Sequence, residues 1–121
     1  MSYNKYRVAA KADRTCDGIV FDSKTEMQRY LELRLALRGR AIKSLKLQPR
    51  YPLVAGIVYV ADFEVEDVDG IHAEDVKGFA TTAFNMKRRL WKEFGPHPLV
   101  ILKRAGKTWK REVVTTEKRN D

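Results

Sequence analysis

The spacing of apolar residues along the chain predicts two helices. From residue 23 to about residue 38 the chain is rich in Leu, Arg, Glu, Met and Gln, which favour helix, and Gly39 follows as a natural end. A second helix is predicted over residues 82–94, where the pattern stops at Gly95 and Pro96. The apolar residues on one side of this second helix are Phe84, Leu90, Trp91 and Phe94.

The remaining regular segments have the composition of strands. Residues 14–21 predict a small hairpin, because Asp17 and Gly18 suit the positive φ angles of a type I′ turn. Residues 57–66 and 71–77 are two β-rich runs joined by the turn-like residues 67–70. Further strands are predicted over residues 42–47, followed by an irregular stretch at 48–50, and over residues 99–103, with one more allowed for over 109–114.

The predicted order is helix, strand, strand, strand, helix, strand, which is typical of an α/β sandwich built around a small mixed sheet. With 121 residues, 44% of them hydrophobic, the chain can bury one core but not two. We therefore expect a single domain over residues 1–121. Its core spans about residues 20–103, and a basic C-terminal tail spans about 107–121.

Composition excludes several classes of protein. The apolar runs are shorter than the roughly 18 residues needed to span a bilayer, and the first residues lack the apolar segment of an export signal. Cys16 is the single cysteine, which excludes an internal disulfide and a multi-cysteine zinc site. His72 and His97 have no partners at ligand spacing. We expect a cytoplasmic protein with no membrane partner and no small-molecule cofactor.

Charge is unevenly distributed along the chain. The net charge is +8, which favours a polyanionic partner. Residues 51–80 carry 7 acidic groups and 1 basic group, whereas the segments on either side are strongly basic. A metal-dependent nuclease uses both signs, since basic groups hold the backbone and carboxylates hold the cation.

Asp62, Asp75 and Lys77 are the candidate chemical groups of the acidic block. If residues 67–70 form a four-residue loop, Asp62 lies opposite Asp75, and if residues 69–70 form a two-residue loop, it lies opposite Lys77. Both alternatives place all three side chains on one face. A loop of odd length would replace Asp75 by Glu74, so the second acid stays open between these two. The alternative interpretation is a solvated acidic face, but residues 58–65 read as a central strand, where an unpaired carboxylate is costly.

Glu26 is a third candidate acid and has a competing structural role. Ser23 and Glu26 form a Ser-x-x-Glu capping box, in which the glutamate bonds back to the helix start. On the helical wheel, however, Glu26 aligns with Tyr30, Leu33 and Leu37, along a buried edge.

Several basic residues are candidates for backbone contacts with a nucleic acid. Lys87 falls within the apolar arc of the second helix, where it either snorkels or reaches the acidic site. The helix residues Arg88 and Arg89 lie outside that arc, and we expect them to contact backbone rather than bases. The same expectation covers the tail residues Lys107, Lys110, Arg111, Lys118 and Arg119.

The segments Ala61-Asp62-Phe63 and Glu74-Asp75-Val76-Lys77-Gly78 resemble the signature of the PD-(D/E)XK nuclease superfamily, an acid on one strand and Asp/Glu-x-Lys on the next. Ala61 stands where that signature has proline. The resemblance covers about residues 20–103 and implies an αβββαβ restriction-endonuclease-like core, in agreement with the predicted element order. Residues 21–30, 47–51 and 74–78 look more closely like a phage-associated family of uncharacterised nuclease-like proteins within that superfamily, related to Holliday junction resolvases.

This resemblance implies a catalytic set of Glu26, Asp62, Asp75 and Lys77, with the three acids as ligands of Mg²⁺ or Mn²⁺ and Gln48 as a weaker supporting residue. It implies hydrolysis of phosphodiester bonds by metal-activated water and does not identify the substrate. Our first hypothesis is a DNA endonuclease, in its narrower form a structure-selective, resolvase-like enzyme of phage DNA replication or recombination. A homodimer is expected for a resolvase, and the host cytoplasm is the expected location of a phage protein. The alternatives are an inactive DNA-binding or accessory module of the same fold and an RNA-directed protein.

Overall fold

The computed structural model describes residues 8–78 and 81–116 and shows a small α/β domain. A five-stranded mixed sheet has the order β3-β6-β7-β8-β9, in which only the β7–β8 pair is parallel. Two short antiparallel hairpins, β1–β2 and β4–β5, lie outside it. The helices are α1 (Lys24–Arg38) and α2 (Thr82–Phe94). The strands are β1 (Thr15–Cys16), β2 (Ile19–Val20), β3 (Ser44–Leu47), β4 (Arg50–Val54), β5 (Ile57–Val60), β6 (Phe63–Asp67), β7 (Gly70–Val76), β8 (Leu99–Ala105) and β9 (Thr108–Val114), and a 3₁₀ turn precedes them at Lys11–Arg14.

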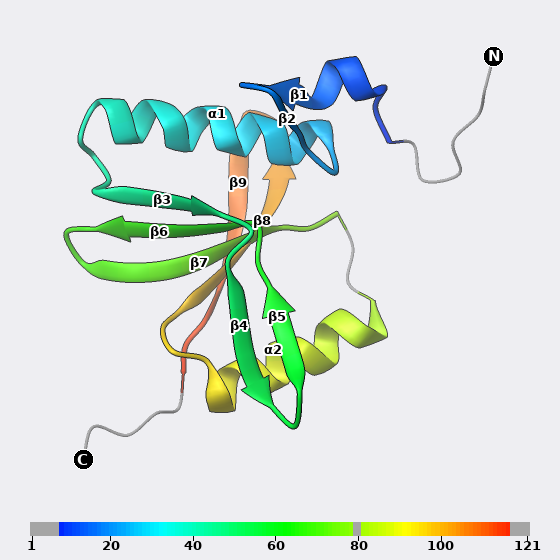
Figure 1. Cartoon of the computed structure of the whole chain (residues 1–121), viewed down its shortest axis with the longest axis vertical. Helices are drawn as coiled ribbons and strands as arrows, with labels where there is room; N and C mark the ends of the chain where they lie inside the picture. The colour runs from blue at the N-terminus through cyan, green and yellow to red at the C-terminus, as the bar shows by residue number, and fades with distance from the viewer. Residues whose placement is uncertain (1–7, 79–80, 117–121) are drawn as a thin grey trace.

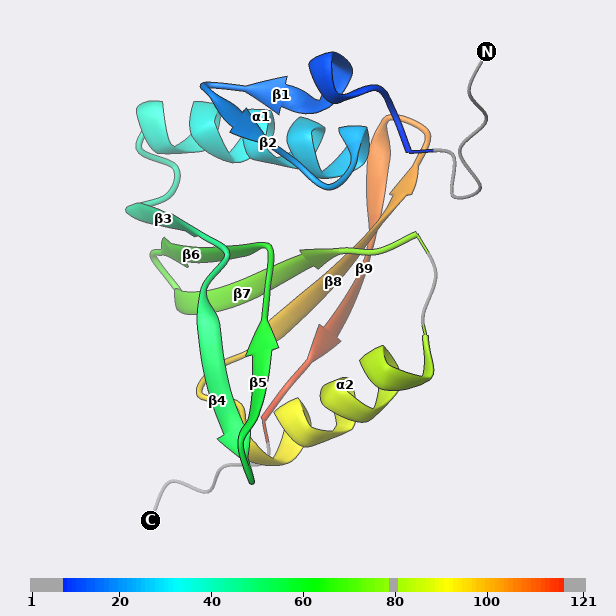
Figure 2. The ribbon, with the colours of Figure 1, turned by 45° about the vertical axis from the view of Figure 1, so that its right-hand side comes forward.

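The sheet separates two layers, each with its own apolar cluster. In Figure 1, α1 and the β1–β2 hairpin lie above the sheet, and α2 lies below it with the β4–β5 hairpin. The turned view in Figure 2 shows β4–β5 running beside α2. The α1-side cluster consists of Phe21, Tyr30, Leu33, Phe63 and Val65. The α2-side cluster consists of Tyr51, Tyr59, Ala61, Ala73, Trp91, Leu99, Ile101 and Val114.

Both predicted helices are confirmed, and local caps fix where they begin and end. The Ser23 hydroxyl accepts the backbone N–H of Glu26 at the start of α1, and Gly39 ends it. The Thr81 hydroxyl accepts the N–H of Phe84 at the start of α2. The predicted hairpin at 14–21 is also confirmed, with φ angles of 53° at Asp17 and 75° at Gly18.

The predicted strand over residues 57–66 is wrong as a single element. It breaks at Ala61 and Asp62 into β5 and β6, which belong to different sheets. Its first half pairs with β4, although residues 48–50 were predicted to be irregular and no strand was predicted after them. Asp62 therefore lies at a corner between two strands and not inside a central strand.

The segment assigned to a C-terminal tail also requires correction. Residues 108–114 form β9, which pairs along its whole length with β8. The allowed strand over 109–114 is thus part of the sheet. Among the described residues, no helix is long and apolar enough to cross a membrane.

Candidate functional site: an acidic corner beside Lys77

Two hydrogen bonds join the corner at Asp62 to β7. The backbone N–H of Asp62 donates to Asp75 Oδ1 at 2.9 Å, and Asp62 Oδ2 accepts the N–H of Val76 at 2.8 Å. The register of β6 and β7 pairs Phe63 with Glu74, so that Asp62 comes opposite Asp75. This is the register expected for the first of the two loop alternatives, although Asp67 and Gly70 form the last pair of the hairpin.

Asp75 is almost completely buried, with 1% of its surface exposed, and the Tyr59 hydroxyl donates to its Oδ2. Burial, and then the neighbouring Asp62 charge, raise the pKa of Asp75 to about 7. Burial, and then a hydrogen bond with the Glu26 carboxyl, raise the pKa of Asp62. The three acids thus form a row in which Glu26 makes Asp62 harder to ionise and Asp62 makes Asp75 harder to ionise.

Glu26 combines the two roles considered for it. Its Oε2 accepts the backbone N–H of Asp22 at 3.2 Å, one residue before the expected Ser23 partner. The same side chain is 5% exposed, and its interaction with Asp62 helps to raise the pKa of that carboxyl. The glutamate therefore caps α1 and also extends the acidic row.

Glu74 points to the other face of the sheet. Its two oxygens accept hydrogen bonds from Arg29 Nε and Nη2 on α1, at 2.7 and 2.8 Å. His72 lies 2.8 Å from Oε2. Although burial alone would raise the pKa of Glu74, His72 and Arg29 bring it down to about 2. Of the two alternatives for the second acid, the structure therefore brings Asp75 to Asp62 and directs Glu74 toward α1.

Lys77 lies at the end of β7 on the face opposite to α1. Its charge opposes the rise in pKa of both Asp62 and Asp75. Its Nζ lies 5.0 Å from the centre of the Phe84 ring. A cavity of about 250 Å³ is lined by Asp75, Lys77 and Lys87, together with Tyr59 and Phe84. Lys87 therefore reaches the cavity at the acidic corner.

The other predicted binding residues are placed differently. Gln48 lines a separate cavity of about 320 Å³ with Glu26 and Asp62, and its N–H donates to the Asp62 carbonyl at 2.9 Å. Arg88 forms an ion pair with Glu112 of β9. Arg89 is exposed over a groove between α2 and β9 that does not include the acids. Lys107, Lys110 and Arg111 are exposed, whereas Lys118 and Arg119 lie outside the described residues.

Two residues of this region were not predicted from the sequence. The first is Tyr59, whose signal was the pair of aromatic residues Tyr51 and Tyr59 on either side of the Ala55-Gly56 turn. The second is Lys103 of β8, which lies across from Lys110 of β9. If residues 99–114 are assumed to form a hairpin, aligning its two strands in the sequence places Lys103 opposite Lys110.

The donor set fits a hard divalent cation, since its members are carboxylate oxygens, whose pKa values are raised first by burial and then by the neighbouring acid. The positions of these side chains fit a single metal ion less well than their chemistry does. Within residues 8–78 and 81–116, no three or more His, Cys, Asp or Glu side chains are close enough to hold a metal ion. Glu26 and Asp62 face one cavity, whereas Asp75 and Lys77 face another.

Fold and corner together define a small α/β protein with a mixed sheet and an acidic row next to a lysine. The chain belongs to a family described as "Protein of unknown function (DUF1064)", whose model matches residues 3–110. No curated protein matches the chain. No solved structure matches it either.

Proposed function

We propose that the chain is a metal-dependent endonuclease that hydrolyses DNA phosphodiester bonds at the acidic corner. The observation that carries the proposal is the pairing of Asp62 with Asp75, two residues before Lys77. Asp62 N–H bonds Asp75 Oδ1 at 2.9 Å, and the Lys77 charge acts on both acids. This is the acid, acid and lysine set of the PD-(D/E)XK signature.

The order of elements in the main sheet supports the same proposal. Leaving aside the β4–β5 hairpin, the chain runs through α1, β3, β6, β7, α2 and β8, which is a helix, three strands, a helix and a strand. The β4–β5 hairpin is an insertion between the first two of these strands, and β9 extends the sheet beyond β8. The proposed restriction-endonuclease-like core therefore corresponds to about residues 24–105.

Each side chain has a distinct proposed role. Asp62 and Asp75 would hold Mg²⁺ or Mn²⁺, with Glu26 as a further ligand on the α1 side. The bound cation would polarise the phosphate and ease deprotonation of the attacking water. Lys77 stabilises negative charge that builds on the phosphate, because it lines the same cavity as Asp75. The Tyr59 hydroxyl orients the Asp75 carboxylate.

A second candidate function is a nuclease-like module that binds DNA without cutting it. It is favoured by one observation: in the part of the chain that the structure describes, the acids do not converge in a three-membered metal site. A resolvase-like homodimer acting in phage recombination is a narrower form of the first proposal, and it requires the hydrolytic activity.

The test is cleavage of end-labelled four-way junction, duplex and single-stranded DNA with Mg²⁺, Mn²⁺ or EDTA. Wild type would be compared with Asp75→Asn and Lys77→Met. The matched control is Asp69→Asn, an exposed acid in the β6–β7 turn. Metal-dependent cutting that both site variants lose and the control keeps would support the endonuclease. Salt-sensitive binding without cutting under any metal would favour the binding module.

A further inference from the structure

Three lysines line up across three neighbouring strands on the α2 side of the sheet. Lys103 and Lys110 are direct partners in the antiparallel β8–β9 pair. Lys77 follows Val76, the residue that pairs with Leu102, and its N–H donates to the Leu102 carbonyl at 2.9 Å. One step further along this register brings Lys77 next to Lys103. We refer to Lys77, Lys103 and Lys110 as the lysine row.

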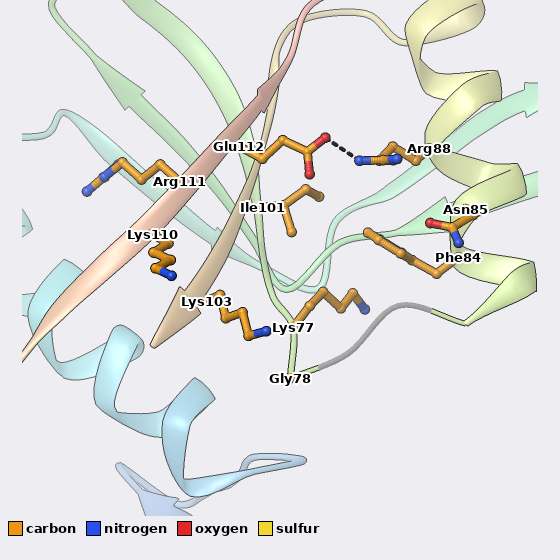
Figure 3. A pocket seen from close by; sticks show the side chains of 10 residues that line it. All are labelled: Lys77, Gly78, Phe84, Asn85, Arg88, Ile101, Lys103, Lys110, Arg111 and Glu112. Atoms are coloured by element: carbon orange, nitrogen blue, oxygen red, sulfur yellow. Dashed lines mark hydrogen bonds and ion pairs between the residues drawn. The ribbon is translucent and has the colours of Figure 1, made fainter. Parts of the chain in front are cut away.

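The lysine row lines a cavity of about 330 Å³ between the sheet and α2. Figure 3 shows the three lysines on one side of it, with Phe84, Asn85 and Arg88 of α2 on the other. Of the described residues that line the cavity, Glu112 is the one acid, and its carboxylate is already paired with Arg88. Among the described residues, no carboxylate forms an ion pair with Lys103 or Lys110.

A row of like charges is a cost to the fold. Side chains directly opposite on antiparallel strands have Cβ atoms about 5 Å apart, and like charges in such positions destabilise the pair. Adjacent strands are spaced about 4.8 Å apart, so the row extends for about 10 Å. An anionic ligand with charges at similar spacing would remove this repulsion. Binding of such a ligand would explain why the chain has three adjacent lysines although they lower the stability of the fold.

We infer that the lysine row binds phosphates of one nucleic-acid strand on the β9 side of the phosphate held at the acidic corner. The inference rests on the proposed function. Lys77 belongs to both places, because it lines the cavity with Asp75 and also the lysine-row cavity. A strand whose reacting phosphate lies at Asp75 would continue past Lys77 to Lys103 and Lys110. The substrate must therefore carry phosphates on that side of the bond that is cut.

The test measures binding of labelled 20-nucleotide single-stranded and duplex DNA in EDTA, by fluorescence anisotropy over a range of KCl concentrations. The row variant is Lys103→Gln/Lys110→Gln, and the control is Lys11→Gln/Lys43→Gln, two exposed lysines on the α1 side of the chain. Loss of two phosphate contacts should reduce the slope of log Kobs against log salt by about 1.4 to 1.8. The control should keep a slope near that of wild type, and an unchanged slope in the row variant would overturn the inference.

Thermal unfolding supplies the second readout. At low salt the row variant should unfold at the same temperature as wild type or higher, which shows that its weaker binding is not misfolding. Inorganic phosphate should raise the Tm of wild type and not that of the row variant. A phosphate response with an unchanged DNA slope would assign the cavity to free phosphate and reject the strand contact.

Binding in EDTA also separates this inference from the proposed hydrolysis. If the protein does not cut DNA, but the row variant shows the expected loss of slope, the proposed hydrolysis is wrong and the proposed phosphate contacts are supported. If the protein cuts DNA, but the row variant has the wild-type slope, the proposed hydrolysis is supported and the proposed phosphate contacts are wrong.

Discussion

Arg29 of α1 binds Glu74 of β7 through two parallel hydrogen bonds, Nε to Oε1 at 2.7 Å and Nη2 to Oε2 at 2.8 Å. The pair is buried, with 9% of Arg29 and 1% of Glu74 exposed. It attaches the helix that carries Glu26 to the strand that carries Asp75. The position of these two acids relative to each other therefore depends on an ion pair on the opposite face of the sheet from Asp75.

Arg29→Leu should lower the free energy of unfolding by about 3–5 kcal/mol, because it leaves the Glu74 charge buried without its main partner. The double variant Arg29→Leu/Glu74→Leu should recover much of this loss, since no buried charge remains. Urea denaturation measures both. Arg34→Leu is the control, because its partner Asp17 is 42% exposed, and its loss should be much smaller. A double variant no more stable than Arg29→Leu would contradict the explanation.

The two helices were predictable because their ends depend on local chemistry, such as the Ser23 cap and Gly39. The break at Asp62 was not. Residues 59–65 keep the strand period of two, yet Tyr59 and Ala61 belong to the α2-side cluster, whereas Phe63 and Val65 belong to the α1-side cluster. The chain crosses from one core to the other within an unbroken apolar pattern, and contacts with β7 and with Gln48 and Pro49 fix where it turns.

The candidate site was predictable as a set of residues but not as a geometry. Neighbouring strand residues face opposite ways, so the choice between Glu74 and Asp75 depended on a turn that the sequence left open. The register of β6 and β7, together with Arg29 on a distant helix, determines it. Lys103 was missed because its partner Lys110 was assigned to a tail.

Mg²⁺ should stabilise the wild-type protein if Asp62 and Asp75 hold it. At ten times its dissociation constant, the cation should add about 1.4 kcal/mol to the free energy of unfolding, which corresponds to a Tm rise of a few degrees. Asp62→Asn should abolish the rise, whereas Asp69→Asn in the exposed turn should keep it. Differential scanning fluorimetry with and without EDTA makes the comparison, and equal rises in both variants would place Mg²⁺ elsewhere.

The contacts of Glu32 with the β8–β9 pair should stabilise the fold in a pH-dependent way. Its carboxylate accepts hydrogen bonds from Arg29, Arg104 and the Trp109 indole. Burial opposes the shift, but these donors hold the pKa of Glu32 below its ordinary value of 4.5. The stabilisation is therefore complete above about pH 4.5 and is lost as the pH falls through the lowered pKa.

Glu32→Gln should accordingly cost about 1 kcal/mol at pH 7, a figure reduced for solvent screening because 40% of the side chain is exposed. The difference between wild type and variant should be smaller at pH 3 than at pH 7, because protonation removes the carboxylate charge as the pH falls through the lowered pKa. Urea denaturation at the two pH values provides the measurement. A difference of the same size at both would show that the carboxylate charge contributes nothing.

Gln48 adopts a left-handed backbone, with φ at 50°, at the corner where β3 ends and the chain turns toward β4. This conformation costs a side-chain-bearing residue about 1 kcal/mol relative to glycine. Gln48→Gly should therefore leave stability unchanged or raise it by about that amount, because the N–H bond to the Asp62 carbonyl is made by the backbone and is retained. If the glutamine side chain supports the acidic corner, the same variant should cut DNA more slowly while it unfolds at higher urea concentration. A variant that is more stable and equally active would remove Gln48 from the site, since nothing but its backbone would then contribute.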